Sequence, residues 1–157
     1  MRQDTNSEVH ALQAAERALL AHGRFFGGLS PAQLDRIAVI GSVLAYPQDT
    51  RIYTLGDEVD DLYVLAEGTV RFTLGLGKRD TPAGDIIRCG EVFGWAALVE
   101  GYSRRIATAY CLTPCEVIAL DGGLLRGFME SDHRAGYLIM KQLAVLLTGE
   151  LTAFAAG

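Results

Sequence analysis

Short runs rich in Val, Ile, Tyr, Phe and Thr recur through the middle of the chain, from about Val39 to Leu120. Examples are "SVLAY", "TRIYTL", "DLYVLAEGTVRFTL", "DIIRCG", "IATAYCL" and "CEVIAL", and Gly, Asp and Pro separate them. A new run roughly every 8–12 residues is typical of an antiparallel sandwich or barrel. Within "LYVLAEGTVRF" we expect a hairpin, because Gly68 readily adopts turn conformations that other residues avoid.

The chain before this region predicts two helices. The first lies in "SEVHALQAAERALLAHG", where Ser7 can cap the start and Gly23 can end the helix. The second is short and follows "FFGGL". Its start carries a capping box, with Ser30 as N-cap, Pro31 at the first helical position and Gln33 three residues after the cap.

The helical pattern returns after Leu120. Asp121 can cap a short helix, and either Ser131 or Asp132 can cap a long one that runs towards Phe154. The long helix has a nearly heptad apolar stripe, and further apolar positions lie off it: Tyr137, Met140, Ala144, Leu147 and Leu151 form the stripe, and Leu138, Leu143, Leu146 and Phe154 lie outside it. A helix with two apolar faces must bury both. We therefore expect a homodimer through this helix, with packing entirely on its own domain as the alternative.

The net charge of −5 at pH 7 argues against a nucleic-acid surface, which needs clustered Lys and Arg. No apolar run reaches the roughly 18 residues that a membrane span needs. The start, "MRQDTNSEVH", is polar and acidic, so we do not expect a signal peptide. These features predict a cytoplasmic protein without a membrane partner.

The three cysteines, Cys89, Cys111 and Cys115, predict free thiols. If "CLTPC" lies on one strand, four residues span about 13 Å, whereas a disulfide needs Cα atoms about 4.4–6.8 Å apart. We expect two half-buried cysteines there rather than a disulfide or a metal site. The three histidines, His10, His22 and His133, fall in predicted helices or at their ends, so we expect no metal site. The candidate nucleophiles Ser42 and Ser103 have no obvious base nearby, so we do not expect an enzyme.

The stretch "GEVFGWAALVEGYSRRIATA", from Gly90 to Ala109, has the residue types of a phosphate pocket. Small residues let backbone N–H groups approach an anion, and a helix start attracts it. We expect "GWAAL" to form one helical turn after a strand. An arginine on the next strand can supply the forked cation that phosphate prefers.

Only one of the two adjacent arginines can face this pocket. On an extended segment Arg104 and Arg105 point to opposite sides. Ala107 and Ala109 share the side of Arg105, and both are small, as a strand that lines a cavity requires. Arg105 is therefore the candidate anion ligand.

Taken in order, these pieces resemble the cyclic nucleotide-binding domain, and most of all the sensor half of the bacterial Crp/Fnr regulators. The resemblance covers roughly Phe25 to Phe154 and rests on "FFGGLSPAQLDRI", on "GDEVDDLYVLAEGTVRF" with Gly56 and Gly68 at the family's turn positions, and on "GEVFGWAAL…SRRIATA". It implies a mainly β fold with flanking helices, a β-roll or jelly-roll barrel with N-terminal helices and a long C-terminal helix. We place an N-terminal helix in residues 1–24 and the domain in 25–157, with the β-roll at about 39–120 and the C-terminal helices at about 121–155.

The last of these stretches is similar to the family's phosphate-binding cassette. The resemblance implies a ligand site at these positions: Gly94, Trp95, Ala96, Ala97, Arg105, Ile106 and Ala107. The glycine and the two alanines of the turn would bring N–H groups to a cyclic phosphate, and Arg105 would pair with it. Ile106 and Ala107 follow where family members contact the phosphate or the base. The terminal helix, around residues 150–152, would approach the base and relay binding to the dimer.

Trp95 departs from the family, whose good binders of cyclic AMP or cyclic GMP usually have an acidic residue there to accept a hydrogen bond from the ribose 2′-hydroxyl. The only polar group of Trp is a donor. Loss of a bond to a charged acceptor costs about 1.5–3 kcal/mol, or one to two decades of affinity. A weaker cyclic nucleotide site, or a site for another phosphate-bearing or acidic ligand, fits this cassette.

The chain ends after "LTAFAAG", with no helix-turn-helix, so we expect a stand-alone ligand-sensing module without direct DNA binding. The alternative is a degenerate barrel that serves as a dimerisation or scaffold module and binds no nucleotide. Arg105 favours the sensor, because an arginine that faces an apolar cavity without an anion is costly. Trp95 favours the scaffold.

Overall fold

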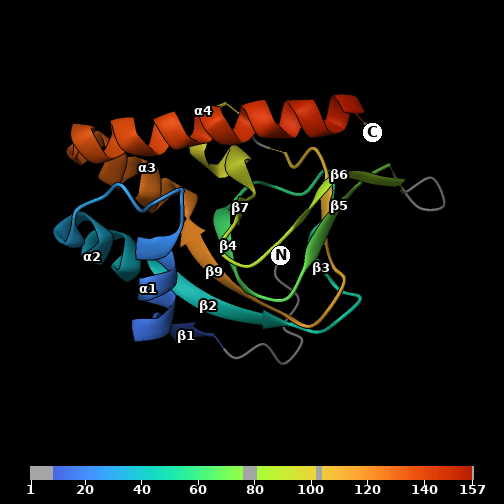
Figure 1. Ribbon diagram of the computed structural model, residues 1–157, viewed down its shortest axis with the longest axis horizontal. Coiled ribbons are helices and arrows are strands. Elements are labelled where there is room, and N and C mark those ends of the chain that lie inside the picture. The colour runs from blue at the N-terminus through green and yellow to red at the C-terminus, as the bar shows by residue number, and fades with distance from the viewer. Residues whose placement is uncertain (1–8, 76–80, 102–103, 157) are drawn as a thin grey trace.

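Two antiparallel sheets pack face to face in the computed structural model, which describes residues 9–75, 81–101 and 104–156 apart from the side chains of Thr81, Ala153, Phe154 and Ala156 (Figure 1). The first sheet has the strand order β1 (His10–Ala11), β2 (Gly41–Tyr46), β9 (Cys115–Asp121), β4 (Asp61–Glu67) and β7 (Val92–Phe93). The second has the order β3 (Arg51–Tyr53), β8 (Thr108–Cys111), β5 (Val70–Leu74) and β6 (Thr81–Ile87). The antiparallel sandwich or barrel that the recurring strand pattern predicts is thereby confirmed.

The space between the sheets is filled by the inward-facing residues of both. Tyr63, Phe72 and Phe93 are buried there beside small residues of β8 and the segment before it. The ring of Tyr63 stacks on that of Phe93, with centroids 5.2 Å apart. A second apolar cluster lies between the first sheet and the helices.

Figure 1 shows α1 (Ala14–His22), α2 (Pro31–Ile40) and α3 (Gly122–Ser131) gathered at one end of the barrel, with α4 (His133–Ala156) running along its side. The predicted caps are present at three helices. Ser30 and Gln33 form the capping box of α2. The Asp121 carboxylate accepts from the backbone N–H of Leu124 at 2.9 Å, and the Asp132 carboxylate accepts from the N–H of Ala135 at 3.0 Å at the start of α4.

Two expectations about local structure are wrong. The first helix begins at Ala14, after the short strand β1, and its N-cap residue is Gln13 rather than Ser7, which lies outside the described residues. The segments on either side of Gly68 do not form a hairpin, because β4 and β5 belong to different sheets. Gly68 does have the expected positive φ, +94°, and a Cβ there would lie 2.4 Å from the Pro114 carbonyl oxygen. The glycine thus lets the chain pass from one sheet to the other.

The "CLTPC" segment is not one strand either. Cys111 ends β8 in the second sheet and Cys115 begins β9 in the first, so the residues between them form the connection. Both thiols are free and buried, as expected of two structural cysteines. Burial and the neighbouring Cys115 raise the pKa of the Cys111 thiol to about 12, so it stays protonated and unreactive at neutral pH.

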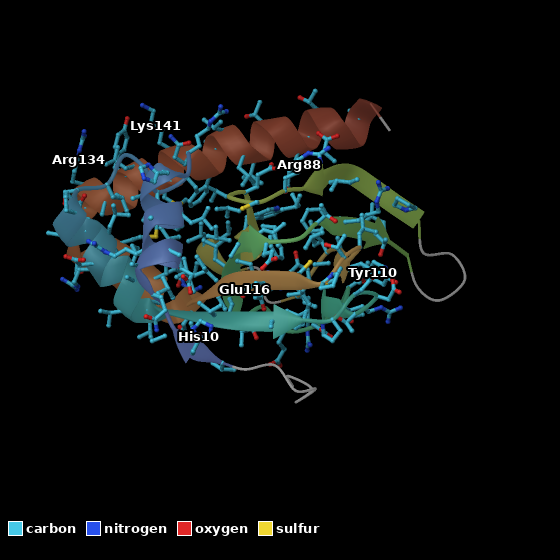
Figure 2. All side chains as sticks on the ribbon, turned by 60° about the horizontal axis from the view of Figure 1, so that its bottom comes forward. His10, Arg88, Tyr110, Glu116, Arg134 and Lys141 are labelled. Carbon is cyan, nitrogen blue, oxygen red and sulfur yellow. The ribbon has the colours of Figure 1, made fainter. Side chains whose placement is uncertain are left out.

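Helix α4 has one face packed on its own domain and one face uncovered. Ile139 and Leu143 are buried, whereas Tyr137, Met140 and Leu151 of the apolar stripe are exposed. Figure 2 shows Arg134 and Lys141 projecting from α4 away from the barrel.

Within the described part of the chain, no helix combines the length and apolar character that crossing a membrane requires. Among the same residues, no group of three or more His, Cys, Asp or Glu side chains is arranged to hold a metal ion.

Candidate functional site

The cassette turn follows β7 directly and has the predicted form. Gly94 adopts φ +76°, a left-handed conformation that glycine accepts without strain, and the 3-10 helix η2 (Trp95–Leu98) begins after it. Ala96 and Ala97 are buried. The Arg126 side chain of α3 donates to the Ala97 carbonyl at 2.5 Å, so α3 fixes the end of the turn.

The segment that contains Arg104 and Arg105 is paired through backbone hydrogen bonds with the segment before β4. The Arg105 N–H donates to the Asp57 carbonyl, and the Gly56 N–H donates to the Arg105 carbonyl, both at 2.8 Å. In this extended pairing Arg104 is exposed and Arg105 is only 3% exposed. Ile106 points outward with Arg104 and is 55% exposed, whereas Ala107 is buried. Of the two residues after Arg105, only Ala107 therefore has its side chain on the inner side.

The Arg105 guanidinium reaches back to the cassette. Nη1 donates to the Gly94 carbonyl at 3.1 Å, and Nη2 donates to the Asp61 carbonyl at 2.6 Å. Its ion pair is long, because Nη2 lies 3.4 Å from an oxygen of Asp60, whose side chain is 51% exposed. Nε is buried and has no hydrogen-bond partner among the described residues. The guanidinium is thus held by two backbone carbonyls and by one long ion pair to Asp60.

Aromatic rings form the apolar wall beside this cation. The Arg105 Cζ lies 4.2 Å from the centroid of the Tyr53 ring and 5.8 Å from that of Tyr63. Burial raises the pKa of the Tyr53 hydroxyl well above its usual value, the charge of Arg105 opposes that rise, and the charge of Glu150 adds to it. Tyr53 therefore lies within the electrostatic reach of both charged groups.

Trp95 turns towards α4. Its indole Nε1 donates to Glu150 Oε2 at 2.8 Å, and its half-buried ring packs against the cluster between sheet and helices. Burial raises the pKa of the Glu150 carboxyl, and the bond from Trp95 acts in the opposite direction. The pair joins the cassette to the long helix.

A cavity near the cassette lies under α4 and has a volume of about 770 Å³. Leu19 and Phe25 line it from the α1 end, Phe72 and Ile87 from the second sheet, and Glu150 from α4. None of the seven site residues expected from the sequence lines it. The cavity adjoins the cassette stretch in two places: Glu91 and Val92 line it directly, and Glu150, which also lines it, accepts the bond from Trp95.

Sequence reasoning located the cassette and Arg105 but missed the groups around them. Tyr53 and Asp60 come from segments far from Arg105 in sequence, and no local spacing links them to it. The acid-rich "GDEVDD" was a usable signal for a carboxylate near the pocket. The stretch around Glu150 was expected to approach a ligand, but its bond to Trp95 was not foreseen.

The sequence model described as "Cyclic nucleotide-binding domain" matches residues 43–132, which include the whole cassette. The chain belongs to the cyclic nucleotide-binding domain family. A solved structure of a candidate cyclic nucleotide-binding protein from Geobacter metallireducens GS-15 superposes with a TM-score of 0.76 at 25% identity, covering 89% of this chain and 99% of that one. The expected resemblance to the cyclic nucleotide-binding domain and the expected fold are confirmed.

Two relatives are larger proteins that contain a similar stretch. Glutaminase 1 of Bradyrhizobium diazoefficiens is 31% identical over 137 residues, which are 87% of this chain and 21% of that protein. The cyclic AMP receptor protein of Thermus thermophilus is 32% identical over 96 residues, 60% of this chain and 44% of that protein. The chain thus spans less than half the length of either relative.

Proposed function

We propose that this chain is a regulatory ligand-sensing module that binds a cyclic nucleotide, cyclic AMP or cyclic GMP, or a related phosphate-bearing ligand, with the phosphate at Arg105. The observation that carries the proposal is the burial of the Arg105 guanidinium together with the length of its ion pair. Arg105 is 3% exposed, and its ion pair to Asp60 is 3.4 Å long. A buried cation is costly unless it is paired closely, and an anionic ligand would supply a closer partner than Asp60 does.

The residues around Arg105 fit a phosphate group. Its Nε has no partner among the described residues and can donate to a ligand oxygen. Ala107 and Ala109 keep the neighbouring strand small on the inner side. A phosphate would accept the guanidinium N–H groups that now face the carbonyls of Gly94 and Asp61. Charge-assisted bonds of this kind are stronger than bonds to neutral carbonyls.

The relatives support two kinds of output. One is named as a receptor of cyclic AMP, and the other is named as a glutaminase. We propose that ligand binding here is passed to another polypeptide segment or protein, which is an enzyme or a transcription regulator. The module itself performs no chemistry in this proposal.

The exposed face of α4 supports a homodimer as the functional unit. Tyr137, Met140 and Leu151 are 59%, 43% and 72% exposed, and all three lie on the heptad-like stripe. Such a stripe is suited to pairing with the same helix of a second copy. A dimer through α4 would place the Trp95–Glu150 pair close to the interface, because Glu150 is on the same helix.

The scaffold function is the second candidate, and the stacked rings favour it. Tyr53, Tyr63 and Phe93 stack beside Arg105 and fill much of the barrel interior. In this alternative Arg105 serves only to bridge the carbonyls of Gly94 and Asp61, and α4 provides the dimer contact.

A thermal-shift measurement with two arginine variants distinguishes the two functions. We expect cyclic AMP or cyclic GMP to raise the melting temperature of the wild type and to leave that of Arg105→Ala unchanged. Arg104→Ala is the matched control, because Arg104 is exposed and one residue away, and it should keep most of the shift. An equal shift in Arg105→Ala and the wild type would remove Arg105 from the site.

A further inference from the structure

Glu150 of α4 lines the cavity and also contacts the cassette turn at Trp95. Its Oε2 accepts from the Trp95 indole at 2.8 Å. Its second oxygen, Oε1, accepts no hydrogen bond from the described residues. A carboxylate oxygen with remaining lone pairs beside a cavity is a strong acceptor for a ligand donor.

The position of the Glu150 carboxylate matters because the side chain of Trp95 has no hydrogen-bond acceptor. The indole has a donor and no acceptor, so the side chain at this position cannot accept a hydrogen bond from a ligand hydroxyl. The same N–H, however, holds the carboxylate of Glu150 in place. A 3′,5′-cyclic phosphate esterifies two of the three ribose oxygens, so the 2′-hydroxyl is the only donor left on the sugar.

We propose that Glu150, positioned by the Trp95 indole, accepts the hydrogen bond of the ribose 2′-hydroxyl in place of an acidic residue in the cassette. This inference rests on the proposed function. Arg105 donates to the Gly94 carbonyl, and Glu150 accepts from the indole of the next residue, Trp95, so both charged groups contact the same turn. One ligand of nucleotide size can therefore contact the arginine with its phosphate and Glu150 with its sugar. Glu150 is a specificity-determining residue, and Trp95 acts through it as a positioning residue.

The test compares each cyclic nucleotide with its 2′-deoxy analogue by isothermal titration. In the wild type we expect the 2′-deoxy compound to bind about 10- to 100-fold more weakly, as for loss of a bond to a charged acceptor. In Glu150→Ala this ratio should fall to near one. In Trp95→Phe, which keeps the ring but loses the N–H, it should fall part of the way.

Glu130→Ala is the control, because it removes the same charge from an exposed position on α3 and should keep the wild-type ratio. Circular dichroism of each variant establishes that it is folded. Binding with no 2′-deoxy penalty in the wild type, or with an unchanged penalty in Glu150→Ala, overturns the inference and leaves the proposed function standing. Glu150→Ala could instead change the ratio of cyclic AMP to cyclic GMP affinity while the 2′-deoxy penalty stays constant. That result would mean that Glu150 contacts the base, and it would also overturn the inference. If the wild type binds neither cyclic nucleotide, the proposed function fails as well.

Discussion

The guanidinium of Arg105 lies over the ring of Tyr53, with its Cζ 4.2 Å from the ring centroid. The same group donates to the carbonyls of Gly94 and Asp61, which belong to the cassette and to β4. A planar guanidinium can lie flat on a ring while its in-plane N–H groups bond two acceptors, a geometry that a tetrahedral ammonium does not reproduce. Arg105 therefore organises the site as well as offering it a charge.

This arrangement predicts that Arg105→Lys destabilises the fold in the absence of any ligand. The lysine ammonium cannot reach both carbonyls that the guanidinium bonds, so at least one buried carbonyl is left without a partner. This costs about 1–3 kcal/mol. Urea denaturation measures the free energy of unfolding. Arg104→Lys, at an exposed position, should change it by less than about 0.5 kcal/mol. Equal stabilities for the two variants would show that the carbonyl bonds contribute little.

Glu150 predicts a specific dependence of stability on pH. Burial raises the pKa of its carboxyl in the folded state above the ordinary value of 4.5. The unfolded chain thus loses this proton at a lower pH than the folded chain does. The stability that Glu150 contributes is fully present below pH 4.5 and is lost as the pH rises through the raised value.

Glu150→Gln removes this titration and keeps an acceptor for Trp95. We expect the free energy of unfolding of the variant, relative to the wild type, to increase between pH 4.5 and neutral pH. The fluorescence of Trp95, the single tryptophan of the chain, should follow the same titration in the wild type and lose it in Glu150→Gln. A relative stability that decreases over this pH range would mean that the pKa of Glu150 is lowered by folding.

The uncovered face of α4 predicts a dimer that two charges disrupt. Leu147 is unsuitable for this test, because it is half-buried and packs against the core of its own domain. Met140→Glu combined with Leu151→Glu changes exposed positions only. We expect light scattering at tens of micromolar to give a dimer for the wild type and a monomer for this variant. Leu124→Glu, an equally exposed apolar position on α3, should remain dimeric, and a monomeric wild type would contradict the prediction.

Trp95→Glu tests whether the cassette can regain its own acceptor. Alone, the change removes the bond to Glu150 and brings a second carboxylate towards it, and like charges repel. We therefore expect the full gain only when Glu150→Gln is present as well. The double variant should bind a cyclic nucleotide about a decade or more tighter than Glu150→Gln alone. If titration shows no gain in a folded double variant, the pocket differs from that of the family at further positions.

The fold was predictable to the extent that its signals are local. The strand spacing, the capping box at Ser30 and Gln33, and the small residues of the cassette are all read within a few positions of the chain. The hairpin expected at Gly68 was wrong, because a turn glycine does not specify which sheet the next strand joins. The "CLTPC" geometry was wrong for a similar reason, since it depends on where β8 ends.

The candidate site shows the same division. The alternation of an extended strand was enough to place Arg105 inside and Arg104 outside. The partners of Arg105 were not predictable, because Tyr53 and Asp61 are brought to it by the pairing of distant segments. The bond from Trp95 to Glu150 spans the cassette and the last helix, and only the packing of α4 along the barrel creates it.

Isothermal titration of the wild type and Arg105→Ala with cyclic AMP and cyclic GMP tests the central claim most directly. We predict saturable binding of at least one of the two nucleotides to the wild type, and a loss of at least about two decades of affinity in Arg105→Ala, as for removal of a charge-assisted contact of about 3 kcal/mol. The absence of heat with either nucleotide for a folded wild type, or equal affinities of the two proteins, would contradict the claim and favour the scaffold function.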